Sequence, residues 1–357
     1  MRGFRPWRAR PGQVVPLRGP GARGQIRDPG ESGAPTGTRP GTARTEPLVA
    51  QRRGYPGTVS STSLPNVPAS GAPHASTPTH WVLTLSCPDG PGIVHAVTGT
   101  LAEHGGNITE SQQFGDPLSG LFFMRVQVES TASRDELESA LAPVIEAFDM
   151  TWNLDVVGRR VRTLVMVSKA AHCLVDLLYR ERSQGMPIEV VGVVGNHRDL
   201  EDIAAFYGKP FHHVPVTRDT KAAAEDRLRE LVAELDVELV VLARYMQILS
   251  DDLCRDLSGQ VINIHHSFLP SFKGARPYAQ AHDRGVKLIG ATSHYVTGDL
   301  DEGPIIEQDV ERVDHSRAVE DLVALGEDVE RRTLARAVRW HAEHRVLLDG
   351  HRTIVFR

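Results

Sequence analysis

The stretch Val261–Pro270 reads VINIHHSFLP, and it decides how the rest of the chain is interpreted. An apolar run gives way there to Asn263, His265 and His266. Open α/β sheets place their functional sites where buried parallel strands end. We therefore expect a buried strand that delivers an amide and an imidazole to the carboxyl edge of a sheet. Side chains alternate along a strand, so Asn263 and His265 should share one face while His266 faces the other way.

The segments around this stretch alternate between apolar runs and amphipathic runs. RTLVMVSK (162–169), IEVVGVVGN (188–196) and VELVVLARYM (237–246) read as strands, and helical patterns follow them. Continuous apolar strands separated by helices indicate a Rossmann-like, mainly parallel α/β sheet with both faces covered. Because no GxGxxG motif follows the first of these strands, a nicotinamide cofactor is not expected.

A different order of elements precedes this region. HWVLTLSCPDGPGIVHAVTGTLAEHGGNIT (80–109) reads as strand, tight turn, helix, turn and strand. Residues 120–130 alternate like a half-buried strand, Ser133 and Glu136 form a capping-box signal for a helix, and residues 150–156 read as a last strand. The resulting order, βαββαβ, is the ferredoxin-like unit. We place this domain at residues 80–158 and the second domain at 159–357.

Composition sets limits on the class of protein. Residues 1–79 contain 13 of the 23 prolines and 11 arginines against three acidic residues, so we expect a disordered Arg/Pro/Gly-rich extension. Its alternatives are an RNA-binding arm, a transit-like sequence or an upstream start of translation. The remaining residues have 42 acidic against 29 basic side chains, which argues against nucleic acid as a partner. No apolar run is long enough to span a membrane, and three scattered cysteines favour a reducing compartment, hence a cytoplasmic protein.

The candidate chemistry lies in two segments. The first provides Asn263 and His265, and the second, ATSHYVTGDLDEGPII (291–306), provides Asp301. An amide can donate to a developing oxyanion, an imidazole moves protons near neutral pH, and a carboxylate orients the imidazole or a water. This set suits the hydrolysis or transfer of an acyl group. Taken singly, Asn263 could equally cap a turn, His265 could be a core histidine and Asp301 a solvated loop residue.

The first domain resembles the ACT family of small regulatory domains. CPDGPGIVHAVTGTLAEHGGNI (87–108) is similar to that family's signature. The resemblance implies paired domains, hence a homo-oligomer (dimer or tetramer), with a small amino acid such as glycine or methionine bound near Asp89, Gly92 and Asn107. The alternative is that these residues only form tight turns, since Gly, Asn and Asp are common in turns without any ligand.

The second domain resembles the folate-dependent formyltransferases. Their mark is N-I-H-x-S-x-L-P followed by L-D-x-G-P-I, found here at 263–270 and 300–305. The resemblance implies a catalytic trio of Asn263, His265 and Asp301. It also implies that two segments hold the folate: Met246, Gln247, Ile248 and Leu249, and Val296, Thr297, Gly298, Asp299 and Leu300.

Two departures separate this chain from the transferases that act on a phosphorylated amine. VSKAAHCLVDLL (167–178) lacks the glycines of a phosphate loop, and His266 stands where those enzymes have proline. The remaining motifs resemble the formyltetrahydrofolate deformylase family. This implies hydrolysis of 10-formyltetrahydrofolate to tetrahydrofolate and formate, with formate supplied to purine synthesis, no permanently bound cofactor and no metal. The alternatives are a formyltransferase for an unphosphorylated amine and a catalytically vestigial amino-acid sensor.

Overall fold

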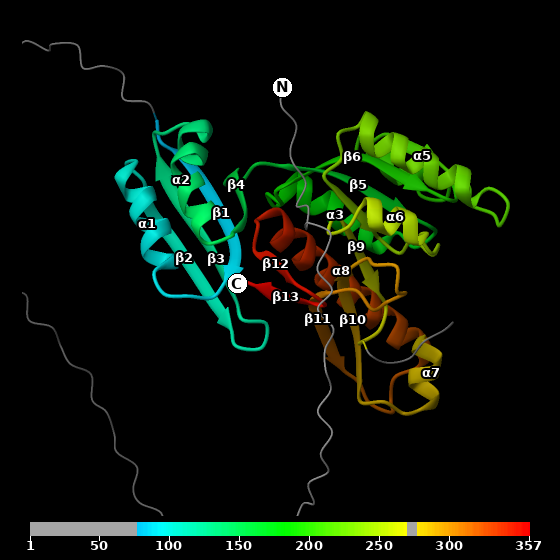
Figure 1. Ribbon diagram of the computed structural model, residues 1–357. Helices are drawn as coiled ribbons and strands as arrows, with labels where there is room; N and C mark the ends of the chain where they lie inside the picture. Colours follow the sequence, from blue (N-terminus) through cyan, green and yellow to red (C-terminus); the bar gives the residue numbers. More distant parts are fainter. Residues whose placement is uncertain (1–76, 270–276) are drawn as a thin grey trace, which may run out of the picture. The chain divides into compact units, whose positions relative to one another are not determined.

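The computed structural model describes residues 77–269 and 277–357, which belong to one compact unit (Figure 1). Almost all of the predicted extension at 1–79 lies outside these residues, as does Pro270 at the end of the VINIHHSFLP stretch. Within the described ranges, none of the helices combines the length and the apolar character needed to cross a membrane.

The first sheet confirms the predicted βαββαβ order. Its strands pair antiparallel in the order β2-β3-β1-β4, and the predicted capping box of Ser133 and Glu136 begins α2. The elements are β1 (Thr79–Pro88), α1 (Ile93–Glu103), β2 (Asn107–Asp116), β3 (Leu121–Ser130), α2 (Arg134–Ala147) and β4 (Thr151–Val156).

The second sheet has seven strands in the order β11-β10-β9-β8-β5-β6-β7. Strands β5 to β9 run parallel to one another, whereas β10 and β11 are antiparallel additions at one edge. The sheet is therefore mixed but mainly parallel, as predicted. Its strands are β5 (Val161–Val167), β6 (Ile188–Gly195), β7 (Phe211–His213), β8 (Leu239–Leu242), β9 (Val261–His265), β10 (Leu288–Tyr295) and β11 (Ile305–Arg312).

Helices connect these strands, and a short hairpin ends the chain. The helices are α3 (His172–Ser183), α4 (Glu201–Phe206), α5 (Lys221–Glu234), α6 (Asp251–Asp256), α7 (Pro277–Asp283) and α8 (Val319–Ala342), and the hairpin consists of β12 (Val346–Asp349) and β13 (Arg352–Val355). The predicted bounds of the strands and helices differ from these by a few residues, because chain ends fray and turn residues extend apolar runs.

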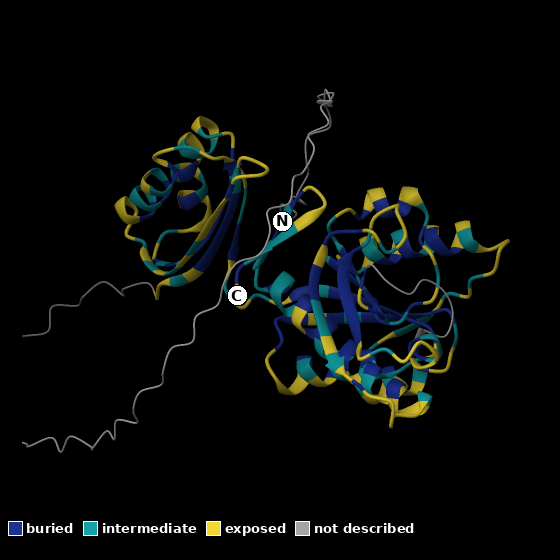
Figure 2. Cartoon of the chain, turned by 90° about the horizontal axis from the view of Figure 1, so that it is seen from below, coloured by how far each residue is buried: buried dark blue, intermediate teal, exposed yellow. Residues whose placement is uncertain are grey.

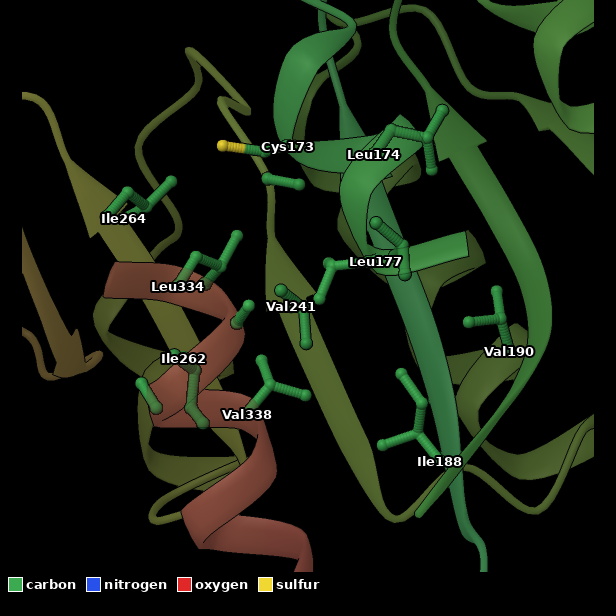
Figure 3. Close-up of a cluster of buried hydrophobic side chains, with 14 of the residues drawn as sticks. Cys173, Leu174, Leu177, Ile188, Val190, Val241, Ile262, Ile264, Leu334 and Val338 are labelled. Carbon is green, nitrogen blue, oxygen red and sulfur yellow. The ribbon is translucent and has the colours of Figure 1, made fainter. Parts of the chain in front are cut away.

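Alternation along the central strands divides the core into two layers. Val165, Val241 and Ile262 pack with α3 and α8, whereas Leu164 and Val240 pack with α5 and α6 on the opposite face. Figure 2 shows the strands of this sheet mostly dark blue between helices whose outer surfaces are yellow. Figure 3 shows the α3/α8 layer, where labelled side chains from two helices and three strands converge: Leu174, Leu177, Ile188, Val190, Val241, Ile262, Ile264, Leu334 and Val338.

The four-stranded sheet contacts the C-terminal hairpin. Phe123 of β3 is buried in an apolar cluster with Leu347 and Phe356. Beside them Arg125 is 1% exposed, and its Nη2 donates to the backbone carbonyl of Glu343 at 3.1 Å. A buried guanidinium is costly unless its N–H groups meet acceptors. The contact between the four-stranded sheet and the C-terminal hairpin therefore combines apolar packing with directed hydrogen bonds.

Candidate active site

Strand pairing places three polar side chains of the site side by side. Asn263 and His265 face away from the α3/α8 layer because Ile262 and Ile264 occupy it. The next strand, β10, pairs antiparallel with β9, and His294 lies directly opposite Asn263 in this register. Two neighbouring strands therefore present an amide and two imidazoles at one place.

A strained loop brings in the carboxylate. Asp301 lies between β10 and β11 with a φ of 58°, in the left-handed region that non-glycine residues rarely adopt. A Cβ on Gly303 would come within 1.8 Å of the Tyr295 carbonyl oxygen, so only glycine lets the loop lie so close to the end of β10. The result is a distance of 3.3 Å between Asp301 Oδ1 and His265 Nδ1. The hydrogen bond with His265 lowers the pKa of Asp301, which favours the carboxylate.

His294 is a site residue that the sequence analysis missed. Burial lowers the pKa of this histidine and keeps its ring neutral. Its Nδ1–H donates to the backbone carbonyl of Tyr295 at 2.9 Å, so Nε2 accepts from Asn263 Nδ2 at 3.2 Å. This bond orients the Asn263 amide. The signal in the sequence was a histidine within a run of mainly apolar and small residues, LIGATSHY (288–295), which forms the buried strand β10.

His266 corrects one prediction. It was expected to face away from His265, yet the two rings stack with centroids 4.9 Å apart and planes 22° apart. The reason is that β9 ends at His265, so the alternation of a strand no longer applies to the next residue. Burial, then the charges of Arg244 and His265, lower the pKa of His266 to about 4. A neutral imidazole therefore lies against His265 at neutral pH.

The two predicted folate-binding segments meet at a common apolar cluster. Leu249 is buried in the cluster on the α5/α6 face, and Val296 packs against the same cluster. A Cβ on Gly298 would lie 3.4 Å from Asp251 Oδ1, so the second segment passes close to the start of α6. Three apolar side chains of the segments are more than half exposed, and they could pack against the faces of a flat ring: Met246, Ile248 and Leu300.

The remaining members of these segments have less direct positions. Gln247 lines a hollow beside α5 together with Ile248 and Leu249 of the same segment. Thr297 donates its hydroxyl hydrogen to the backbone carbonyl of Asp299 at 3.2 Å, which shapes the loop. Thr297 and Asp299 therefore help to shape the loop of the second segment.

The predicted amino-acid site is divided in the structure. Asp89 and Gly92 lie together in the turn between β1 and α1, where Gly92 has a φ of 94°. Asn107 begins β2 opposite Glu129, which pairs with His80 at the other end of β1. Because β1 is ten residues long, about 30 Å separate these two places. One chain therefore does not gather all three residues around a ligand.

One group among the described residues has metal-ligand chemistry. His172, Cys173 and Glu330 offer ligand atoms within 4.8 Å of one another. Both oxygens of Glu330 already accept hydrogen bonds, from His172 Nε2 at 2.8 Å and from the Tyr278 hydroxyl at 2.7 Å. Burial also raises the pKa of the Cys173 thiol well above its usual value. These residues fit a metal ion poorly.

Comparison with protein-family models supports two domains. The ACT domain model matches residues 81–146, and the formyl transferase model matches residues 161–338. A crystal structure of glycinamide ribonucleotide transformylase 1 from Symbiobacterium toebii is 32% identical, with a TM-score of 0.52, and the match covers 57% of this chain and 98% of that one. The transferases therefore share the second domain.

Other relatives match both domains. The crystal structure of formyltetrahydrofolate deformylase from Burkholderia mallei ATCC 23344 is 52% identical, with a TM-score of 0.76, and the match covers 78% of this chain and all of that one. Formyltetrahydrofolate deformylase from Corynebacterium sp. (strain P-1) is 54% identical over 279 residues, which are 77% of this chain and 98% of that protein. The chain belongs to the formyltetrahydrofolate deformylase family, a family of hydrolases.

Proposed function

We propose that this chain hydrolyses 10-formyltetrahydrofolate to tetrahydrofolate and formate by means of Asn263, His265 and Asp301. The observation that supports this most directly is the 3.3 Å pair of His265 and Asp301 beside the oriented amide of Asn263. This is the combination of base, orienting carboxylate and oxyanion donor that acyl hydrolysis requires.

In the proposed reaction, each of these side chains has its own role. Asp301 holds His265, and together they take a proton from a water whose oxygen forms a bond to the formyl carbon. The Asn263 amide donates to the resulting oxyanion, and His294 keeps that amide in position. When the carbon–nitrogen bond breaks, its electron pair stays on the leaving nitrogen, which receives the proton from His265. Water has then been divided between formate and tetrahydrofolate.

The substrate is expected to lie between the two segments that meet near Leu249 and Val296. We assign the pterin ring to the backbone of residues 246–249 and to the loop of residues 296–300. The exposed apolar side chains of Met246, Ile248 and Leu300 support this assignment, because a bound ring would cover them. No permanently bound cofactor takes part in this scheme.

Regulation is assigned to the first domain, for which we keep the bounds 80–158. An effector such as glycine or methionine would contact Asp89 and Gly92 of one copy and Asn107 of another, because one chain separates these residues. The protein would then be a homo-oligomer. The released formate would supply purine synthesis and balance the one-carbon pool.

The decisive experiment is to incubate the purified protein with 10-formyltetrahydrofolate alone and to measure formate. We expect continuous formate release that added amines do not change. Consumption of the donor only when an amine is present would contradict the proposal and identify a transferase.

A further inference from the structure

The loop that carries Asp301 leads into the edge strand of the seven-stranded sheet. Asp301 precedes Ile305, the first residue of β11, by four positions, and among the described strands β11 pairs only with β10. The register of this pair shifts between Ser293 and His294, and His294 pairs with Ile305. Such an irregularity locally interrupts the ladder of hydrogen bonds between two strands. The start of β11, and with it the loop of Asp301, therefore needs support from outside the ladder.

Successive backbone carbonyls at the start of β11 point in opposite directions. The Pro304 carbonyl accepts the backbone N–H of Tyr295 in β10 at 2.9 Å. The next carbonyl, that of Ile305, therefore points away from β10, toward the open edge of the sheet. There it accepts the hydroxyl of Thr353 in β13 at 2.6 Å. Thr353 thus supplies the hydrogen bond that a neighbouring strand would supply in the middle of the sheet.

The loop before Ile305 is packed too tightly to absorb a displacement. Gly303 lies so close to the Tyr295 carbonyl that a Cβ would come within 1.8 Å of its oxygen. Asp301 has a φ of 58°, a conformation that persists only while the surrounding structure imposes it. A shift at Ile305 would therefore release Asp301 from this conformation and lengthen its 3.3 Å distance to His265.

The other side of the hairpin is fixed to the four-stranded sheet. Arg352 pairs with the buried Asp116, the last residue of β2. Phe356 is buried in one apolar cluster with Phe123 of β3. Because successive side chains of a strand point to opposite sides, Arg352 and Thr353 face different ways. One of them joins the hairpin to the first domain, and the other joins it to the catalytic loop.

We propose that Thr353 is a positioning residue for the hydrolysis, because it holds the start of β11 so that Asp301 reaches His265. The hairpin thereby makes the packing of the first domain part of the support of the active site. This inference rests on the proposed function, which assigns Asp301 and His265 to the reaction. In that reaction Thr353 contacts none of the reacting atoms, and it acts only through Asp301.

The test compares the wild type with Thr353→Val, which loses the hydroxyl at nearly the same size, and with Thr353→Ser, which keeps it. Thr151→Val, at an exposed position of β4, is the matched control. Steady-state formate release from 10-formyltetrahydrofolate gives kcat and KM. Hydrogen exchange of peptides that span residues 299–306 reports on the loop without substrate. Thermal melting shows whether each variant is folded.

We expect Thr353→Val to lower kcat about threefold to tenfold, the range that one hydrogen bond allows, while KM stays nearly unchanged. Exchange in residues 299–306 should become faster. Thr353→Ser should restore both properties, and Thr151→Val should match the wild type. In the Asp301→Asn background, Thr353→Val should lower kcat no further, because Thr353 acts through Asp301.

Three results would overturn the proposal. They are an unchanged kcat in Thr353→Val, a loss that Thr353→Ser does not restore, and a loss that adds in full to that of Asp301→Asn. A wild type that releases no formate would instead refute the proposed function. The exchange data would still decide whether Thr353 holds the loop, since they are measured without turnover.

Discussion

The two larger sheets of the described chain distribute their polar residues in opposite ways. In the seven-stranded sheet, Asn263 and His265 lie in the last residues of the parallel strand β9 and Arg244 follows the parallel strand β8, so the topology gathers their backbones at one edge. In the four-stranded antiparallel sheet, successive strands end at opposite edges, and Asp89 lies about 30 Å from Asn107. A parallel sheet can therefore complete a site within one chain, whereas the amino-acid site that we propose for the antiparallel sheet would need residues from a second copy.

The largest expected effect concerns the self-contained site. Asp301→Asn keeps the shape of the side chain but removes the charge that orients His265, so kcat should fall by about 10² or more. Steady-state formate release measures it, and Asp219→Asn in an exposed turn is the control. Turnover near that of the wild type would show that Asp301 has no part in the reaction.

The next prediction separates the two sheets by pH. His341 of α8 bonds the Tyr295 hydroxyl through Nδ1 at 2.7 Å, and burial lowers its pKa to about 4. Between the unfolded value of about 6.5 and the folded value, the unfolded chain binds more protons, so stability falls as the pH falls through this window. The loss from this histidine is at most about 3 kcal/mol. Above pH 6.5 it contributes nothing.

The first sheet should not share this loss. There the Leu118 backbone N–H and then Arg352 lower the pKa of Asp116 to about 2, so this stabilisation is present above the ordinary carboxyl pKa and lost only toward pH 2. Hydrogen exchange measured at pH 7 and at pH 4.5 should show that protection falls more in β10 and α8 than in β1 and β3 at the lower pH. His341→Gln should reduce that difference. Simultaneous loss of protection in both sheets would contradict the prediction.

Local sequence patterns predict the strands and the motifs of the site, but not the contacts that depend on strand register, backbone conformation or the point where a strand ends. The order of strands follows from periodicity, and the motifs around Asn263 and Asp301 indicate the trio. His294 escaped notice because its position opposite Asn263 depends on the antiparallel register of β9 and β10, which no local pattern specifies. The left-handed backbone of Asp301 escaped it because a positive φ cannot be read from an aspartate. The stacking of His266 depends on where a strand stops, the least predictable feature of a strand.

A smaller effect tests whether the site is one unit. His294→Leu should lower kcat about tenfold, because the Asn263 amide loses the acceptor that orients it. Asn263→Ala should lower kcat further, and the double variant should be no worse than Asn263→Ala, since His294 acts through Asn263. Additive losses in the double variant would mean that His294 acts independently of Asn263. Thermal melting of each variant distinguishes lost orientation from lost structure.

The smallest expected effect concerns the divided site. A bound amino acid can favour one arrangement of subunits only if it binds that arrangement more tightly. We therefore predict that glycine or methionine changes formate production several-fold, and that Asn107→Ala abolishes the response without loss of basal activity. Gln113→Ala, at another exposed position of the same strand, should respond like the wild type.

Sedimentation shows whether that response depends on pairing. If the effector lies between Asp89 and Gly92 of one copy and Asn107 of another, it should stabilise the oligomer, and a monomeric protein should not bind it. Calorimetry with both amino acids decides between this site and a purely structural domain. Flat activity curves without detectable binding would mean that Asp89, Gly92 and Asn107 only form turns, and that the antiparallel sheet serves the chain through its packing alone.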